Sequence, residues 1–213
     1  MKKHFIITFL TFHAILSLAQ EVIPEGKTVS NKGIGLGLRY GIGSNTITSN
    51  NTGGISLSSL ISPLNFGFII EGNISDNFAI QPELQYIQKG FTMSSGGVSV
   101  DAKFNYLGLN ILPKLKFGNE NIEAALFAGP SLNANLSAKA SANGQSADIP
   151  DAGGLDLGAI FGVGIANKFK SGKLFFDVRY NLGLSDISTE SPQSSTDKLN
   201  QLGVNIGYIF KLN

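Results

Sequence analysis

The chain of 213 residues has no cysteine and no tryptophan, and its two histidines, His4 and His13, both lie close to the N-terminus. Without cysteine the protein is neither a lipoprotein nor a secreted domain stapled by disulfides. Beyond His13, metal sites of the Cys or His type are excluded, and so is catalysis by an imidazole base or a Ser-His-Asp triad. Charge is sparse and balanced at a formal +1, which argues against a nucleic-acid binder.

The N-terminus has the features of an export signal. A cationic start over residues 1–4 precedes the apolar run Phe5–Leu18, and Ser17 and Ala19 place small residues where a signal peptidase cleaves. The alternative is a membrane anchor, but the run falls short of the roughly 20 apolar residues that a spanning helix needs. We therefore expect residues 1–19 to be removed on export.

A strict alternation follows in Ile34-Gly35-Leu36-Gly37-Leu38-Arg39-Tyr40-Gly41-Ile42-Gly43. Every even position is large and apolar, and every odd position is glycine or arginine. A period of two indicates a β-strand with one face in an apolar medium. The other face is almost bare of side chains, which is typical of a narrow closed barrel with lipid outside and a tight interior.

The same alternation predicts eight strands, each longer than the 5–6 residues of a typical soluble strand and long enough to cross a bilayer at a tilt. They are Gly33–Ser44, Pro63–Ile74, Phe78–Phe91, Phe104–Phe117, Ile122–Leu136, Leu157–Asn167, Lys173–Ser185 and Leu199–Leu212.

The connections between these strands alternate between short and long. Tight turns occur at Ser75–Asn77, Asn119–Asn121 and Phe169–Gly172. Outer-membrane barrels sort their connections in this way, with short periplasmic turns and long extracellular loops, whereas a soluble barrel or sandwich, the alternative fold, has no reason to. The long polar stretches are Asn45–Ser62, Thr92–Lys103, Ser137–Asp156 and Asp186–Lys198.

We therefore predict an all-β fold, an eight-stranded antiparallel transmembrane β-barrel over residues 33–213, in the outer membrane of a Gram-negative bacterium. Residues 1–19 are its signal peptide and residues 20–32 a periplasmic N-terminal leader. In lipid an open sheet edge is costly, so the eighth strand must pair with the first. We expect a monomer in contact with outer-membrane lipid. Two aromatic girdles are expected, one near the loops at Tyr40, Tyr86 and Tyr180, the other near the turns at Phe78, Phe117 and Phe210.

Six charged residues have the parity of the inward face. An eight-stranded interior is only wide enough for side chains to fill, so these groups would meet across it and neutralise one another, as buried charges must. They form either a plug or a narrow, gated ion path. Because their strands are neighbours, we expect Arg39 to pair with Glu71. The set is Arg39, Glu71, Glu83, Lys114, Asp177 and Arg179.

Catalysis is not expected. The carboxylate pairs Asp148 with Asp151 and Asp186 with Glu190 could in principle serve as acid and base, but acids in polar loops are usually solvated. Calcium could bind such loop oxygens, yet their spacing matches no EF-hand. We predict no enzyme activity, no cofactor and no metal.

Four short motifs resemble the PorT-like outer-membrane β-barrel family. Residues 104–116, Phe-Asn-Tyr-Leu-Gly-Leu-Asn-Ile-Leu-Pro-Lys-Leu-Lys, resemble its "YLEIPLLLKY" strand, although Gly108-Leu109-Asn110 lacks the family's acidic residue. The other motifs are Ala128-Gly129-Pro130, Gly162-Val163-Gly164, and Arg179-Tyr180 followed by Gly183-Leu184. The resemblance implies an outer-membrane barrel and, from the member that names the family, a link to protein secretion.

The long loops suggest a function. Their Ser, Asn, Thr and Gly content suits hydrogen-bonding surfaces, so we expect a structural, adhesive or partner-binding scaffold that takes an extracellular ligand or protein through its loops. The alternatives are a small gated pore for ions or small solutes and an accessory component of a protein secretion system.

Overall fold

A computed structural model describes residues 33–49, 55–149, 154–186 and 197–212. These residues form β1 (Ile34–Ser49), β2 (Ser56–Asn73), β3 (Phe78–Ser95), β4 (Val98–Gly118), β5 (Ile122–Ala142), β6 (Gln145–Asp148), β7 (Leu155–Phe169), β8 (Gly172–Gly183) and β9 (Asp197–Lys211). No helix among the described residues is long and apolar enough to cross a membrane. The expected signal peptide and leader, residues 1–32, lie outside the described ranges.

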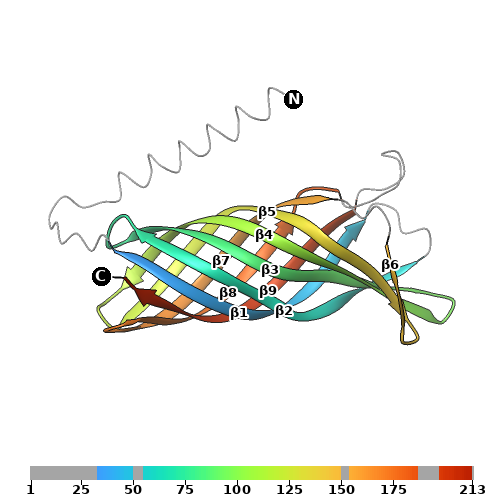
Figure 1. Cartoon of the computed structure of the whole chain (residues 1–213), viewed down its shortest axis with the longest axis horizontal. Helices are drawn as coiled ribbons and strands as arrows, with labels where there is room; N and C mark the ends of the chain where they lie inside the picture. The colour runs from blue at the N-terminus through green and yellow to red at the C-terminus, as the bar shows by residue number, and fades with distance from the viewer. Residues whose placement is uncertain (1–32, 50–54, 150–153, 187–196, 213) are drawn as a thin grey trace, which may run out of the picture. The chain divides into compact units, whose positions relative to one another are not determined.

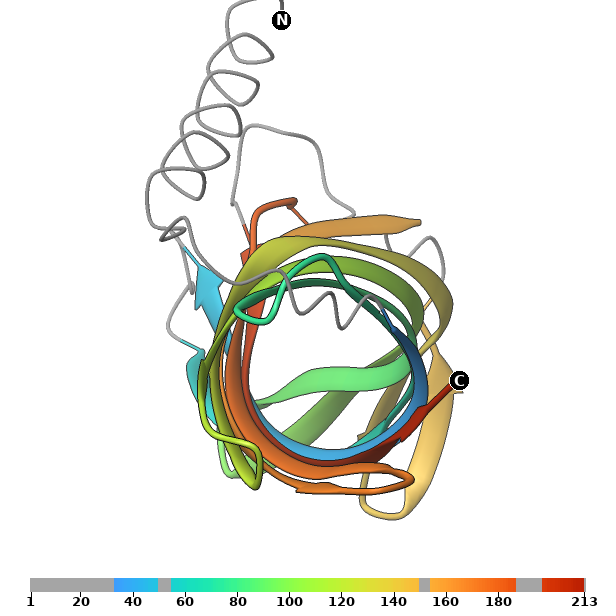
Figure 2. The ribbon, with the colours of Figure 1, turned by 90° about the vertical axis from the view of Figure 1, so that its left-hand side faces the viewer.

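Eight of the strands close into a ring. The order is β4-β3-β2-β1-β9-β8-β7-β5, and β4 pairs with β5 to complete the circle, which Figure 2 shows end on. The first and last strands are joined in antiparallel register from Gly35 opposite Lys211 to Ser49 opposite Asp197. The short β6 pairs only with the end of β5 and takes no part in the ring. The predicted eight-stranded antiparallel barrel is therefore confirmed.

The two ends of the barrel differ, and we call them the short-turn end and the loop end. The short-turn end carries the tight connections β2–β3, β4–β5 and β7–β8 (Figure 1, left). In one of these turns the Asn119 side chain accepts the backbone N–H groups of Asn121 and Ile122, which fixes the turn. The start of β1 and the end of β9 meet at this end, where the Leu212 N–H donates to the Ile34 carbonyl at 2.9 Å.

Three of the expected long loops are in fact largely paired strand. In Asn45–Ser62, β1 runs on to Ser49 and β2 begins at Ser56. The stretch Thr92–Lys103 continues β3 and β4 up to a two-residue turn, with Gly96 at φ 57° and Gly97 at φ 82°. Likewise β5 runs on to Ala142 and turns into β6. These extensions carry few large apolar residues, although Ala102 and Ala138 are buried inside, so the sequence interpretation ended the strands too early.

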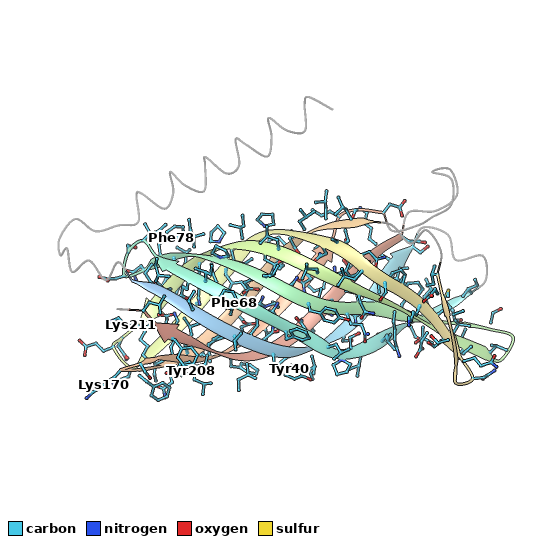
Figure 3. The ribbon with its side chains drawn as sticks, in the orientation of Figure 1. Tyr40, Phe68, Phe78, Lys170, Tyr208 and Lys211 are labelled. Atoms are coloured by element: carbon cyan, nitrogen blue, oxygen red, sulfur yellow. The ribbon has the colours of Figure 1, made fainter. Side chains whose placement is uncertain are left out.

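The faces alternate as predicted. Leu38 is 62% exposed on the outer wall, whereas its neighbour Arg39 is 3% exposed inside. On the outside, Tyr40 lies opposite Phe66, which stacks on Tyr86 with ring centroids 5.1 Å apart, so these rings form one level of the wall. In Figure 3 Phe78 and Tyr208 lie at the short-turn end and Tyr40 farther toward the loop end.

The inward glycines make room for side chains from neighbouring strands. A Cβ atom at Gly41 would overlap the Asn205 amide, and one at Gly162 would overlap the Phe127 ring. Small residues on one strand therefore face larger ones on the next, and the narrow interior can hold long polar side chains.

A charged side chain on the outer wall should be tolerated only where the wall lies outside the hydrocarbon core of the bilayer. We expect Leu38→Arg to lower the free energy of unfolding into lipid by roughly 2–4 kcal/mol, as measured for arginine near a bilayer midplane. Val98→Arg is the matched control, because Val98 is exposed at the tip of the β3–β4 hairpin. Equal losses in a denaturant titration of the two variants would show that Leu38 does not face lipid.

Candidate functional site

The candidate site is the interior of the barrel. All six charged residues singled out by parity lie inside, each at most 6% exposed. The structure brings them together in two groups along the barrel instead of one. Arg39, Glu83, Asp177 and Arg179 form the central cluster, and Glu71 and Lys114 belong to a turn-end cluster nearer the short-turn end.

The central cluster joins strands from opposite sides of the ring. Glu83 on β3 accepts Arg179 Nη1 of β8 at 2.8 Å and Arg39 Nε of β1 at 3.2 Å, both on Oε2. Arg179 also holds Asp177 Oδ2 at 2.6 Å. The guanidinium of Arg179 lies 5.1 Å from the centre of the Phe127 ring. Two cations and two carboxylates thus balance in a space closed to water.

Amide side chains complete the hydrogen bonding of these charges. Arg39 Nη1 donates to Asn65 and Asn205 at 2.8 Å each, and Arg39 Nη2 donates to Gln85. Asn205 in turn donates to Asp177 at 2.8 Å. A buried charge is tolerated when its remaining hydrogen-bonding capacity is met in this way.

The turn-end cluster contains residues that the sequence interpretation left out. Glu71 is held between Lys114 Nζ at 2.9 Å and Lys173 Nζ at 2.7 Å. Lys173 also contacts Glu123 Oε1 at 2.6 Å, and Lys116 Nζ donates to Asn73 at 2.6 Å. The inward parity of Lys173 and Glu123 was readable from their strands, and this signal could have added both to the set.

The expected pairing of Arg39 with Glu71 is not found. The register of β1 and β2 sets Arg39 opposite Gly67, and it sets Glu71 opposite Gly35. Four residues along a strand correspond to about 13 Å, so the two charges belong to different levels. Arg39 reaches Glu83, two strands away, across the bare backbone of Gly67.

A further ion pair lies toward the loop end. Lys89 Nζ contacts Asp156 Oδ2 at 2.7 Å, with both side chains at most 2% exposed, and the Ser185 hydroxyl donates to Asp156 Oδ1 at 3.1 Å. Sequence reasoning missed this pair because it assigned Asp156 to a loop. The structure places Asp156 on β7, facing inward.

Around this pair the interior becomes apolar. Lys89 Nζ lies 5.8 Å from the centre of the Tyr106 ring, and Tyr106 belongs to a cluster that we call the apolar layer. The sequence analysis looked for polar residues at inward positions and therefore did not predict this layer. The members of the apolar layer are Ile87, Phe91, Ala102, Phe104, Tyr106, Ala138 and Leu199.

A small void lies between the two clusters. An interior cavity lined by Gln81, Lys114, Glu123, Phe127 and Asp177, among others, has a volume of about 10 Å³, roughly the space of one water molecule. The arrangement can hold the wall together electrostatically.

The structure describes only one acid of each expected loop pair. Asp148 is exposed on β6, and Asp186 accepts the backbone N–H of Asp197 at 2.9 Å. Their expected partners, Asp151 and Glu190, lie outside the described residues. Within the described ranges, no group of three or more His, Cys, Asp or Glu side chains could hold a metal ion.

Comparison with solved structures finds similar outer-membrane proteins. The outer-membrane protein OprG from Pseudomonas aeruginosa superposes with a TM-score of 0.53 at 10% identity, over 85% of this chain and 96% of that one. Ail, the attachment invasion locus protein of Yersinia pestis, gives 0.47 at 11% over 85% and 99%. AlkL, solved in lipid bilayers, gives 0.49 at 14% over 90% and 95%. At such identities the likeness concerns the fold.

None of the curated proteins matches the sequence. A family does: the one described as outer membrane protein beta-barrel domain matches residues 19–189, which is most of the chain. This match agrees with the closed ring, its apolar outer wall and its polar interior. The chain therefore belongs to the outer membrane protein beta-barrel domain family and is a protein of the outer membrane.

Proposed function

We propose that this protein is a closed outer-membrane scaffold that binds an extracellular partner through its loop end. The observation that carries the proposal is the filled lumen, in which ion-paired groups lie at successive levels: the turn-end cluster, the central cluster and the Lys89–Asp156 pair. The apolar layer packs around the last of these. A lumen filled in this way favours a structural or binding role over transport.

The charges act as a plug because separating them is costly. Glu83 and Glu71 are each held by two cations. Removing one partner of a buried pair typically costs 3–5 kcal/mol, because the other charge is then stranded. An open water path would have to separate several such contacts at once, so the closed state is favoured.

The loop end offers a preformed binding surface. The β3–β4 hairpin extends with cross-strand hydrogen bonds from Thr92 to Asp101 at 2.7 Å and between Ser94 and Ser99 at 2.9 Å. These hydroxyl and carboxylate groups are held in place before a partner arrives, which lowers the entropy cost of binding. A glycan or a polar protein surface is the chemistry that they suit.

The alternatives remain distinct proposals. A narrow gated ion path would use the same charged side chains inside the barrel. The polar side chains between the charged clusters favour this path as the second candidate function. A role as an accessory component of a secretion system depends on the PorT-like resemblance. We also propose that the protein is monomeric. We propose further that it is not an enzyme, since the carboxylates of the interior are neutralised by Lys and Arg.

If the lumen is plugged, the protein should not conduct ions across a bilayer. Purified wild-type protein in a planar bilayer should show no steady conductance. Replacing Arg39, Glu83, Asp177 and Arg179 by alanine should open discrete conductance steps only when alanine also replaces Glu71, Lys114, Lys173, Lys89, Phe91 and Phe104, because the turn-end cluster and the apolar layer otherwise still fill the lumen. The control carries alanine at the outward neighbours Leu38, Leu84, Val178 and Tyr180 and should stay silent. Steady conductance of the wild type would favour the pore.

The central cluster should behave as a coupled unit. We expect Arg39→Met to lower the free energy of unfolding by about 3–5 kcal/mol, and adding Glu83→Gln should recover part of that loss. Arg39→Met with Glu71→Gln should give additive losses, since these residues belong to different levels. Double-mutant cycles in detergent or lipid measure both couplings, and additivity for Arg39 with Glu83 would contradict the pairing.

Shortening one hairpin tests the binding surface. Deleting Ser94, Ser95, Val98 and Ser99 removes two cross-strand pairs and keeps the Gly96–Gly97 turn and the strand parity. Nanodisc-held protein is applied to arrays of glycans and extracellular proteins. The wild type should bind a component that the shortened variant binds at least tenfold more weakly, with both barrels electrically silent. No binding by the wild type, or equal binding by both, would overturn the proposal.

A further inference from the structure

The charges of the central cluster and of the Lys89–Asp156 pair are balanced, but those at the short-turn end are not. At this end the inward positions of β2, β4, β5, β7, β8 and β9 contribute more lysines than glutamates. We call these residues the basic mouth, and it contains the turn-end cluster. Its five lysines are Lys114, Lys116, Lys168, Lys173 and Lys211, and its two glutamates are Glu71 and Glu123.

The two glutamates of the basic mouth are already shared between cations. Glu71 lies between the ammonium groups of Lys114 and Lys173. Glu123 contacts Lys173 at 2.6 Å and Lys168 at 3.4 Å. Among the described residues of this end, cations remain in excess when the exposed charges of the turns are included. These are Asp76, Glu120 and Lys170.

Lys116 is the buried lysine of the mouth that no carboxylate neutralises directly. It is 6% exposed, and its ammonium group donates to Asn73 Oδ1 at 2.6 Å. Within the part of the chain that the structure describes, no carboxylate oxygen lies at ion-pair distance from it. An ammonium group has further N–H bonds to donate, and a buried charge is stabilised by a counter-ion. Lys116 therefore has the capacity to bind an anionic acceptor.

The ammonium groups of Lys116 and Lys173 lie on adjacent levels of the interior. Lys116 Nζ is held by Asn73 and Lys173 Nζ by Glu71 at 2.7 Å. Asn73 and Glu71 are two residues apart on the inward face of β2, which corresponds to about 7 Å along a strand. An ion with several anionic oxygens can therefore accept hydrogen bonds from both groups.

The mouth is accessible from the end of the barrel. The Lys168 side chain is 36% exposed, whereas that of Lys173 is 10% exposed. Lys211 is also exposed, and Figure 3 shows it at the short-turn end. This end faces the periplasm in an outer-membrane barrel. A small solute from the periplasm can enter past these two rim lysines, whereas the lipid lies on the opposite face of the same strands.

We propose that the basic mouth is a binding site for a small soluble oxyanion of the phosphate type. Its oxygens accept hydrogen bonds from Lys116 and Lys173, and the rim lysines Lys168 and Lys211 add to the attraction. Charge-assisted hydrogen bonds of this kind are strong, and lysine commonly binds phosphate as a point charge. The excess of ammonium donors over carboxylate acceptors selects an anion as the ligand. This site lies at the opposite end of the barrel from the proposed partner-binding surface and is independent of it.

The test is a calorimetric titration of inorganic phosphate into the protein in a non-ionic detergent, where no lipid phosphate competes. The wild type should bind phosphate saturably at a single site. Lys116→Gln should weaken binding by about tenfold or more, the factor carried by a hydrogen bond to a charged group. Lys116→Arg keeps the charge and should retain binding. Phosphate should also raise the unfolding temperature of the wild type more than that of Lys116→Gln, because a ligand of the folded state stabilises it.

A control variant and a change of lipid separate this site from general attraction. Lys170→Gln removes the same charge from the exposed β7–β8 turn at the same end and should leave the phosphate affinity unchanged. In nanodiscs of phosphatidylcholine and of phosphatidylglycerol the affinity should be equal at high ionic strength, as expected for a soluble ligand. The proposal is overturned by a wild type without saturable binding, by an equal loss in Lys170→Gln, or by binding that phosphatidylglycerol abolishes, which would assign the mouth to a lipid headgroup.

Discussion

Backbone hydrogen bonding in lipid is the constraint on which the rest of the molecule depends. An unpaired N–H or C=O group in hydrocarbon costs several kcal/mol, so the sheet has to close, and β1 pairs with β9 over almost its whole length. With eight strands in the ring the enclosed space is narrow. Side chains from opposite walls then contact each other, and each long inward residue needs a small one beside it.

The inward polar residues follow from that narrowness. A carboxylate in the interior cannot reach water, so it must find a cation from another strand. Glu83 takes its partners from β1 and β8, and Glu71 takes its partners from β4 and β8. The same contacts that neutralise the charges therefore tie distant strands together and stabilise the barrel.

The alternation of apolar and polar residues was enough to predict the eight strands of the ring, which face of each strand is outward, and the inward position of the six charges. Pairing was not predictable, because it depends on register and on bulges: the register of β1 with β2 shifts between Gly41 and Gly43, and Arg39 meets Glu83 instead of Glu71. The hairpin turn at Asn143-Gly144 has a sequence signal, yet its Ser and Ala flanks hide the strands. Phe104 and Tyr106 stood at the expected end of a strand, so the apolar layer could not be recognised.

The seam between β1 and β9 has a consequence for how the molecule forms. It joins the first strand of the barrel to the last, so the wall has an open edge until nearly the whole chain has been made. Loop closure over such a separation is entropically slow compared with the local hairpins. The contact of Glu83 with Arg179 likewise spans β3 and β8. The hairpins can therefore assemble early, whereas the central cluster is completed only when the ring closes. Its ion pairs then stabilise the finished barrel.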